Sequence, residues 1–450
     1  MSHTENLKFW IKVSELFEEV CHRVDQTWQK RKRILNTKLL VIFILKMVLS
    51  KNKQGYGSGL SQLWESCEEK GISLPQMNAI AASSICEARQ KLPETVFKIL
   101  SQELIELWHN HRKVPTWNGH KVFAIDGTKI NGPRGLLNYG YKVAKNTTRH
   151  YPYGMFSCMY NLQEQLVYDF ELVPHGDERG CAIEHLKKLN HGDLVIFDRG
   201  YFSYLMLYTA INLKINVVFR MQSGKTNKQV SSFLNSDKVN EIIEYYPSDA
   251  VRSDLKKRNH HLNFKPLKLR LVKHQIGNET YVYATNLIDE SKYPTDCFPD
   301  LYHGRWGIEE LYKISKCFID VEDFHSQTER GVKHELYGHI LLINIAKIFE
   351  ADTNTMLSPD SQAEVENPMH SITELNSGAT LKINFKHCLA VVGRHLEDLI
   401  LASKALMEIW LYKSMQAVSK IRQRMRPGRS YPRISFKVRS RWSSFGASKA

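Results

Sequence analysis

One short segment of the chain places four polar side chains along a single line of a predicted helix. Residues 302–316 read YHGRWGIEELYKISK, and Asp300, which follows Pro299, is a suitable N-cap. At about 100° per residue, Arg305, Glu309 and Lys316 fall within roughly 60° of Tyr302. The apolar residues lie roughly 140° away on a separate core face: Ile308, Leu311, Ile314, Phe318 and Ile319. We therefore expect this polar stripe to face away from the core and to meet an anionic partner.

The charge of the whole chain favours the same kind of partner. Its 62 Lys and Arg exceed its 47 Asp and Glu, which gives a net charge of +15. Such a surplus favours polyanions, of which nucleic acid is the commonest. The rival partner is an anionic membrane surface, but no segment has the one-sided basic and aromatic pattern that this requires. The longest apolar run, Leu39–Leu49, is interrupted by Lys46 and is too short to span a bilayer.

The last part of the chain repeats this charge bias without any acidic residue after Glu408. Basic residues interleaved with aromatic ones are typical of nucleic-acid-binding segments. These residues are Lys420, Arg422, Arg424, Arg426, Arg429, Arg433, Lys437, Arg439 and Arg441, with Tyr431, Phe436 and Trp442.

The cysteines indicate the compartment. All 8 are scattered, with no C-x-x-C pair, which favours a reducing cytoplasm and argues against a structural zinc site. The sequence after Met1 also lacks the apolar stretch of a signal peptide.

A chain of 450 residues is expected to form two or three domains. Residues 1–115 are predicted to be a helical N-terminal region, for which DNA-end binding is a hypothesis that the sequence permits. Its helices are expected at Phe9–Gln29, Ile34–Leu49, Leu60–Lys70, Met77–Lys91 and Glu94–Trp108.

Residues 116–350 show the alternating pattern of an α/β domain. Helices at Cys181–Leu189 and Phe202–Asn212 separate short apolar strands, so we predict a mixed five-stranded sheet with helices on its faces. This is also the order of elements in the ribonuclease-H-like fold. The strands are expected at Lys121–Ile125, Met155–Leu162, Leu166–Val173, Asp193–Phe197 and Ile215–Phe219.

The remaining segments surround this domain. Residues 221–299 are predicted to be a largely β insertion, with strands at Leu267–His274 and Thr280–Asn286. A helix is expected at Glu329–Glu350, followed by a polar loop or spacer at residues 351–380. Residues 381–450 are predicted to be a helical and basic C-terminal region, with helices at Asn384–Ser403 and Lys404–Arg424.

Two aspartates each end an apolar strand of the predicted sheet. Asp126 precedes Gly127 and Asp198 precedes Arg199, and either one alone is most often only a turn residue. Together they place two carboxylates at strand ends, where open α/β sheets hold their active sites. Glu309 makes a third acid, and such a trio suits two Mg²⁺ ions. Two metals about 3.5–4 Å apart activate a water or a 3′-hydroxyl and stabilise the leaving oxygen at phosphorus.

The cations of the polar stripe fit that chemistry. Arg305 and Lys316 would clamp phosphates of the scissile strand and Tyr302 would hydrogen-bond one, with Lys129 and Arg199 as further DNA contacts. The alternative is a solvated helix face with charge pairing between residues four apart.

Two other motifs lack the geometry for catalysis. His334 and His339 surround Glu335 as in zinc-protease helices, but they are five residues apart, which separates them by about 140° rather than placing them on one face. Ser157 lacks the elbow motif of a hydrolase nucleophile.

The four stripe residues fit, without a gap, the Y-x2-R-x3-E-x6-K signature, and the chain resembles the bacterial insertion-sequence DDE transposases that carry a β-strand insertion. FAIDGTK around Asp126 and LVIFDRGY around Asp198 are similar to the first and second Asp motifs of that family. The resemblance covers about Val122 to Ala346, and SICEARQKLP (Ser84–Pro93) is similar more faintly.

This resemblance implies a ribonuclease-H-like fold with Asp126, Asp198 and Glu309 as the metal-binding catalytic triad. It implies Mg²⁺-dependent cleavage at the ends of the element, with Mn²⁺ as a substitute ion, and attack of the freed 3′-hydroxyl on target DNA. The implied partners are the terminal inverted repeats, the target DNA and a second copy of the chain. Two alternatives stay open: a transposase-derived DNA-binding protein that no longer transposes, and a metal-dependent DNA nuclease.

Overall fold

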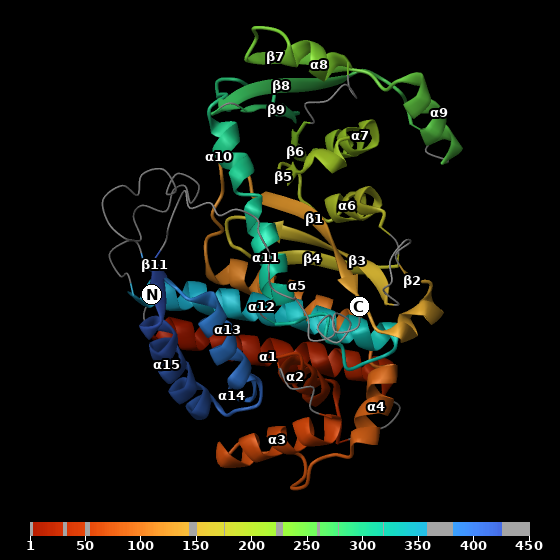
Figure 1. The fold of residues 1–450 in the computed structure, drawn as a ribbon. Helices are drawn as coiled ribbons and strands as arrows, with labels where there is room; N and C mark the ends of the chain where they lie inside the picture. The colour runs from red at the N-terminus through yellow and green to blue at the C-terminus, as the bar shows by residue number, and fades with distance from the viewer. Residues whose placement is uncertain are drawn as a thin grey trace, which may run out of the picture.

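The computed structural model describes residues 3–29, 34–49, 55–143, 151–174, 176–221, 228–258, 262–277, 279–317, 319–357 and 381–424. A layer of helices forms one end of the molecule, a twisted sheet crosses its middle, and the last strands of that sheet reach the opposite end (Figure 1). Three segments lie outside the described part of the chain: the basic residues 30–33, residues 358–380 of the predicted spacer, and the basic tail at residues 425–450.

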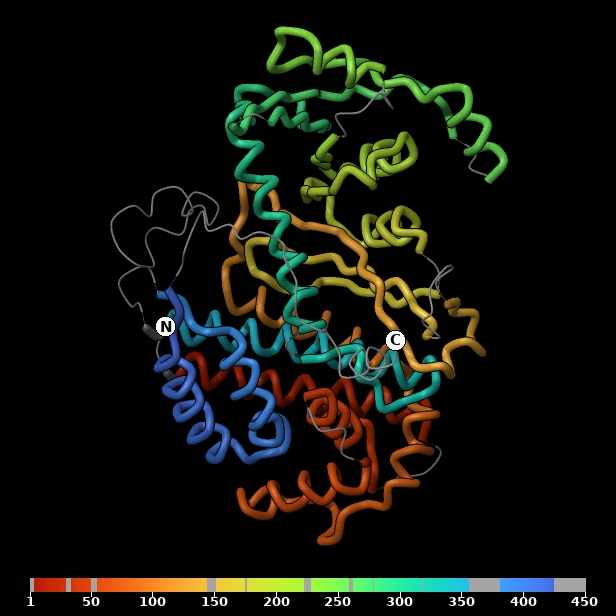
Figure 2. Tube along the Cα trace, viewed as in Figure 1, coloured from red at the N-terminus to blue at the C-terminus, as the bar shows by residue number. Residues whose placement is uncertain are grey.

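The N-terminal helices share a core with helices from much later in the chain. They are α1 (His3–Trp28), α2 (Thr37–Met47), α3 (Tyr56–Glu69), α4 (Ala82–Lys91) and α5 (Thr95–His111). The long helix α12 (Glu329–Leu357) runs through their layer, and α13 (Phe385–Arg394), α14 (Leu396–Ile400) and α15 (Lys404–Lys420) lie beside it (Figure 2). Chain segments hundreds of residues apart therefore bury one apolar cluster.

Several boundaries differ from the sequence prediction. Residues 77–81 are not helical, because α4 begins at Ala82, and α12 continues to Leu357, into the segment expected to be a polar loop. The C-terminal region is not wholly helical either. Strand β11 (Arg422–Arg424) pairs antiparallel with β10 (Leu381–Ile383), so the predicted helix is wrong at its last residues.

A single sheet contains the five strands predicted for the central domain, the two predicted for the insertion, and two more. Its order is β2-β3-β1-β5-β6-β9-β8-β7, and β4 pairs with β3. Strands β1, β5 and β6 are parallel and the other pairs are antiparallel, so the fold is the predicted mixed α/β architecture, consistent with a ribonuclease-H-like fold. The strands are β1 (Val122–Asn131), β2 (Lys142–Val143), β3 (Pro152–Asn161), β4 (Val167–Val173), β5 (Leu194–Phe197), β6 (Asn216–Arg220), β7 (Asn240–Tyr245), β8 (Leu267–Ile276) and β9 (Glu279–Thr285).

The insertion extends the sheet instead of forming a separate β unit. Strand β9 pairs with β6, and β8 and β7 follow outward from it. The insertion is also less purely β than predicted, because it includes helices α8 (Lys228–Leu234) and α9 (Asp249–Lys257).

Helices cover the two faces of the central strands. Phe123 and Ile125 of β1 pack on one face with α6 (Glu178–Leu186) and α7 (Tyr204–Asn212). Ala124 between them belongs to the cluster on the opposite face, which includes residues of α12, since alternate residues of a strand point to opposite faces. On that side Asn344 of α12 hydrogen-bonds both the N–H (2.9 Å) and the C=O (2.8 Å) of Val167, which satisfies part of the outer edge of β4.

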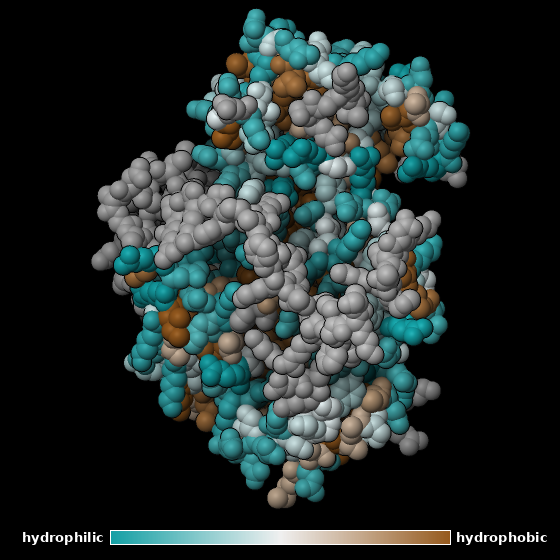
Figure 3. All heavy atoms as spheres, viewed as in Figure 1, coloured by the Kyte–Doolittle hydropathy of each residue, from teal (hydrophilic) through white to brown (hydrophobic). Residues whose placement is uncertain are grey.

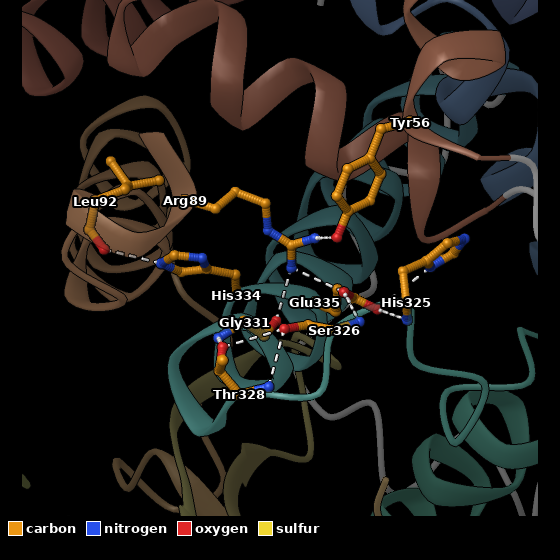
Figure 4. A network of polar contacts seen from close by, with 9 residues as sticks. All are labelled: Tyr56, Arg89, Leu92, His325, Ser326, Thr328, Gly331, His334 and Glu335. Atoms are coloured by element: carbon orange, nitrogen blue, oxygen red, sulfur yellow. Dashed lines mark hydrogen bonds and ion pairs between the residues drawn. The ribbon is translucent and has the colours of Figure 1, made fainter. Parts of the chain in front are cut away.

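A buried ion pair joins α4 to α12 (Figure 4). The Arg89 guanidinium donates to the Glu335 carboxylate at 2.8 Å, and Glu335 also accepts the backbone N–H groups of His325 (2.8 Å) and Ser326 (3.1 Å). The neighbouring His334 contacts the carbonyl of Leu92 at 3.0 Å. His334 and Glu335 therefore connect the helical layer to α12 and to the loop that precedes it.

On the face shown in Figure 3, the described surface is mostly hydrophilic, with small and separate apolar patches. No described helix combines the length and the apolar character that crossing a bilayer requires.

Candidate active site

Asp126 and Asp198 lie at matching positions along two neighbouring parallel strands. Asp198 directly follows β5 as predicted, but β1 continues to Asn131, so the prediction that Asp126 ends its strand is wrong. Ala124 of β1 pairs with Ile196 of β5, and each aspartate lies two residues beyond that pair. Because side chains alternate along a strand, Asp126 is expected on the face of Ala124, and Asp198 continues the face of Ile196. That face is covered by α10 (Cys297–His303), which carries Tyr302, and α11 (Trp306–Cys317), which carries Glu309 and Lys316.

The segment predicted as one helix from Tyr302 to Lys316 is two helices. Helix α10 ends at His303, Gly304 and Arg305 form a turn, and α11 begins at Trp306. Asp300 is not the N-cap, because it lies inside α10. Gly307 fits the close approach of α11 to the sheet, since a Cβ there would lie 3.2 Å from the Tyr160 ring.

Two of the four stripe residues are buried, so the prediction that the whole stripe avoids the core is wrong. Tyr302 is 5% exposed and its hydroxyl donates to Asp198 Oδ1 at 3.1 Å. The Arg305 side chain is 8% exposed, and its Nη2 donates to Glu309 Oε1 at 2.7 Å. Its Nη1 lies 3.9 Å from Asp126 Oδ2. Through Tyr302 and Arg305, the three predicted catalytic acids are linked in one network.

The two aspartates differ in their electrostatic surroundings. The pKa of Asp126 is raised to about 6, mainly by burial and also by the charges of Glu178 and Asp198, which together outweigh the N–H of Gly127 and the charge of Arg305. Burial also raises the pKa of Asp198, but the backbone N–H of Arg199, the charge of Arg305 and the Tyr302 hydroxyl outweigh it, so the net shift is downward.

In metal-free buffer, the charge of Asp126 should therefore destabilise the folded protein. Its folded pKa of about 6 exceeds its ordinary value of 3.8, so its contribution to stability is complete below about pH 4 and is lost as the pH rises through 6. The Asp126→Asn variant removes this loss. We expect the difference in unfolding free energy between variant and wild type to grow by up to about 3 kcal/mol from pH 4 to pH 7. Urea denaturation with a chelator measures it, and a difference that does not vary with pH would contradict the expectation.

The remaining predicted contacts lie at the edge of this network. The Lys316 ammonium donates to Thr128 Oγ1 (2.7 Å) and to the carbonyl of Lys129 (2.5 Å), which fixes the end of α11 on β1. The Lys129 ammonium lies 5.3 Å from the centre of the Tyr153 ring. Both Lys129 and Arg199 are exposed. The eight predicted site residues thus lie on β1, on α10 and α11, in the turn between these two helices, and in the turn after β5.

Three residues that the sequence reasoning did not identify also contact or influence Asp126. Tyr312 donates to its backbone carbonyl at 2.6 Å, and Tyr201 approaches its Oδ1 at 3.4 Å. Glu178, in the first turn of α6, is close enough to raise the pKa of Asp126. Tyr201 ends the DRGY motif and Tyr312 lies three residues after Glu309, so proximity to the motifs was the signal that could have found them.

The donor set fits hard divalent cations, which prefer carboxylate oxygens. Burial and the negative charges of Glu178 and Asp198 raise the pKa of Asp126, and an added cation at this position would offset both effects. In the described part of the chain, however, no three His, Cys, Asp or Glu side chains already lie close enough together to hold a metal ion. The Arg305 guanidinium instead occupies the position of a cation between Asp126 and Glu309.

Comparison with known proteins agrees with these motifs. Residues 117–345 match the family described as "Transposase DDE domain", and residues 11–102 match "Insertion element 4 transposase N-terminal". The chain is 22% identical over 334 residues to the transposase InsG for insertion sequence element IS4 of Escherichia coli, covering 73% of this chain and 72% of that protein. It is 26% identical over 226 residues to the transposase for insertion sequence element IS231F of Bacillus thuringiensis, covering 41% of this chain and 47% of that protein.

A solved structure of the piggyBac transposase synaptic complex with hairpin DNA aligns with 91% of this chain and 85% of its own. Its TM-score of 0.40 and identity of 11% are too low to bear on function. The family match covers just over half of the chain and includes every residue of the site described above. The chain therefore belongs to the DDE transposases, enzymes that cleave DNA and transfer its strands.

Proposed function

We propose that Asp126, Asp198 and Glu309 are the metal-binding catalytic acids of this transposase. The observation that carries the proposal is the linked network in which Tyr302 bonds Asp198 while Arg305 bonds Glu309 and approaches Asp126. Residues from three distant parts of the chain converge there, at the end of β5 and beside the middle of β1. Two divalent metal ions bound by these carboxylates would activate the attacking water or 3′-hydroxyl and stabilise the leaving oxygen.

The residues around the acids have separate roles in this proposal. Tyr302 positions Asp198 by a hydrogen bond to its carboxylate, and Tyr312 positions Asp126 by a hydrogen bond to its backbone carbonyl. Arg305, Lys316, Lys129 and Arg199 bind phosphates of the DNA, because they supply positive charge at the border of the acidic centre. Arg305 is suited to two oxygens of one phosphate, since its guanidinium is planar and bidentate.

DDE transposases depend on a divalent metal, and we propose Mg²⁺, with Mn²⁺ as a substitute, because the three proposed ligands are carboxylates, whose oxygens suit these hard ions. We further propose that two copies of the chain act on paired terminal inverted repeats. The transposases IS4 InsG and IS231F, to which this chain is similar, are named for insertion sequences, which supports element ends as the substrate.

A strand-transfer assay tests the proposal. The full chain is incubated with Mg²⁺, a plasmid carrying the inverted repeats that flank its gene, and a second plasmid as target. Joined products support transposition, and cleavage without joining would support the nuclease instead. Binding without cleavage would support a DNA-binding protein that has lost catalysis.

Lys316→Ala should weaken end binding and lower its salt dependence. Loss of one phosphate contact is expected to reduce the slope of log K against log salt by about 0.9, because one counterion fewer is released. Fluorescence anisotropy at several salt concentrations measures this. Lys313→Ala is the matched control, because Lys313 is exposed on the same helix and should leave the slope unchanged. An unchanged slope for Lys316→Ala would mean that Lys316 only anchors α11 on β1 and does not contact a DNA phosphate.

A further inference from the structure

The guanidinium of Arg305 is placed between two of the proposed metal ligands. Its two terminal nitrogens face different carboxylates: Nη2 is 2.7 Å from Glu309 Oε1, and Nη1 is 3.9 Å from Asp126 Oδ2. The Tyr302 ring lies 5.5 Å from the guanidinium carbon and carries the hydroxyl that bonds Asp198. One buried cation is thus connected to all three acids.

A divalent ion and this guanidinium need the same oxygen atoms. The Glu309 oxygen that accepts from Nη2 has a lone pair engaged in that bond. A second cation beside the guanidinium would also be repelled by it, and the repulsion is strong where both are shielded from water. Arg305 and the metal therefore compete for Glu309 and Asp126.

The guanidinium has a second anion available when DNA is bound. Its Nε–H has no acceptor among the described residues, so Arg305 does not use all of its donors on the carboxylates. A phosphate offers several oxygens in the bidentate geometry that the guanidinium fork matches. Transfer of the fork from carboxylate to phosphate would leave Glu309 and Asp126 with uncompensated negative charge.

We propose that Arg305 is the internal counter-cation of this site: it occupies the proposed metal ligands in the DNA-free protein and releases them when a DNA phosphate takes its place. The inference rests on the proposed assignment of Asp126, Asp198 and Glu309. It follows by linkage that DNA and the divalent ion strengthen each other's binding by the same factor. The DNA-free enzyme would bind metal weakly, which limits cleavage away from its substrate.

The test measures Mn²⁺ binding to the full chain by calorimetry and by the electron paramagnetic resonance signal of free Mn²⁺. Without DNA, Arg305→Gln should bind Mn²⁺ about tenfold more tightly than wild type, within the usual range of coupling between sites. Arg305→Lys keeps the charge and should stay closer to wild type. In wild type, a duplex with a pre-cleaved end that lacks the 3′-hydroxyl should tighten Mn²⁺ binding by the same factor, and in Arg305→Gln it should have little effect.

Lys313→Gln is the control for net charge, because it removes an exposed cation of α11 that has no role in the proposed site. It should change Mn²⁺ affinity by less than about twofold. Equal tightening in both variants would overturn the proposal in favour of a general effect of net charge. Unchanged or weaker binding by a folded Arg305→Gln would also overturn it, as would wild-type affinity that does not respond to DNA, a result that needs no variant.

These outcomes are separable from those of the proposed function. If end cleavage in Mg²⁺ depends on Asp126 while Mn²⁺ affinity does not depend on Arg305 or DNA, the catalytic assignment stands and the counter-cation role falls. If Asp126→Asn changes neither cleavage nor Mn²⁺ binding, the assignment of the site itself fails.

Discussion

Glu309→Ala is expected to lower cleavage of end DNA by at least about 10³-fold while leaving DNA binding nearly intact. The expected loss corresponds to about 4 kcal/mol of transition-state stabilisation, a reasonable size for removing a ligand that positions catalytic metal. Binding should persist because a carboxylate makes no favourable contact with phosphate. Single-turnover cleavage and anisotropy on the same substrate measure the two effects.

Two further variants separate catalysis from structure at this position. Glu310→Ala is the matched control, because Glu310 is the next residue of the same helix and is exposed. It should cleave at close to the wild-type rate. Glu309→Gln keeps an acceptor for Arg305 but is a poor metal ligand, so it should be as inactive as Glu309→Ala. Recovery of cleavage in Glu309→Gln would mean that Glu309 only anchors Arg305, and loss of DNA binding in both would mean that it maintains the fold.

The two strands that carry Asp126 and Asp198 were predictable because their signal is local. Each aspartate follows a short apolar run, and such runs are typical of buried strands. The structure places them on adjacent strands in matching register. Which strands pair was not predictable in this way, because β1 and β5 join residues 72 positions apart and β9 and β6 join residues about 65 positions apart. No local pattern of side chains contains that information.

The burial of Arg305 was not predictable from helical periodicity. Helical periodicity assumes an unbroken helix, whereas a turn at Gly304 and Arg305 separates α10 from α11. Whether a glycine breaks a helix depends on packing, and here α11 approaches the ring of Tyr160 closely at Gly307. The periodic pattern gave the right residue types at the site but placed Tyr302 and Arg305 facing solvent, because a polar residue on a helix is ordinarily exposed.

The second large effect is expected far from the acids, at the ion pair between α4 and α12 (Figure 4). Arg89→Met should destabilise this junction by about 3–5 kcal/mol, the usual loss when one member of a buried pair is removed. Arg89 is 4% exposed and Glu335 is 4% exposed, so the variant leaves a carboxylate buried without its main partner. It also removes the bond from Arg89 to the carbonyl of Gly331, which is 2.9 Å long.

Denaturation and hydrogen exchange together test this prediction. Glu335 accepts the N–H groups of His325 and Ser326, so these amides should exchange faster in Arg89→Met. Arg330→Met is the control, because its pair with Glu94 is 3.6 Å long and its side chain is 48% exposed, and it should lose less than about 1 kcal/mol. The double variant Arg89→Met with Glu335→Leu should regain part of the stability, since no charge is then left buried. If Arg89→Met costs no more than the control, the pair does not hold the N-terminal helices to the loop between α11 and α12.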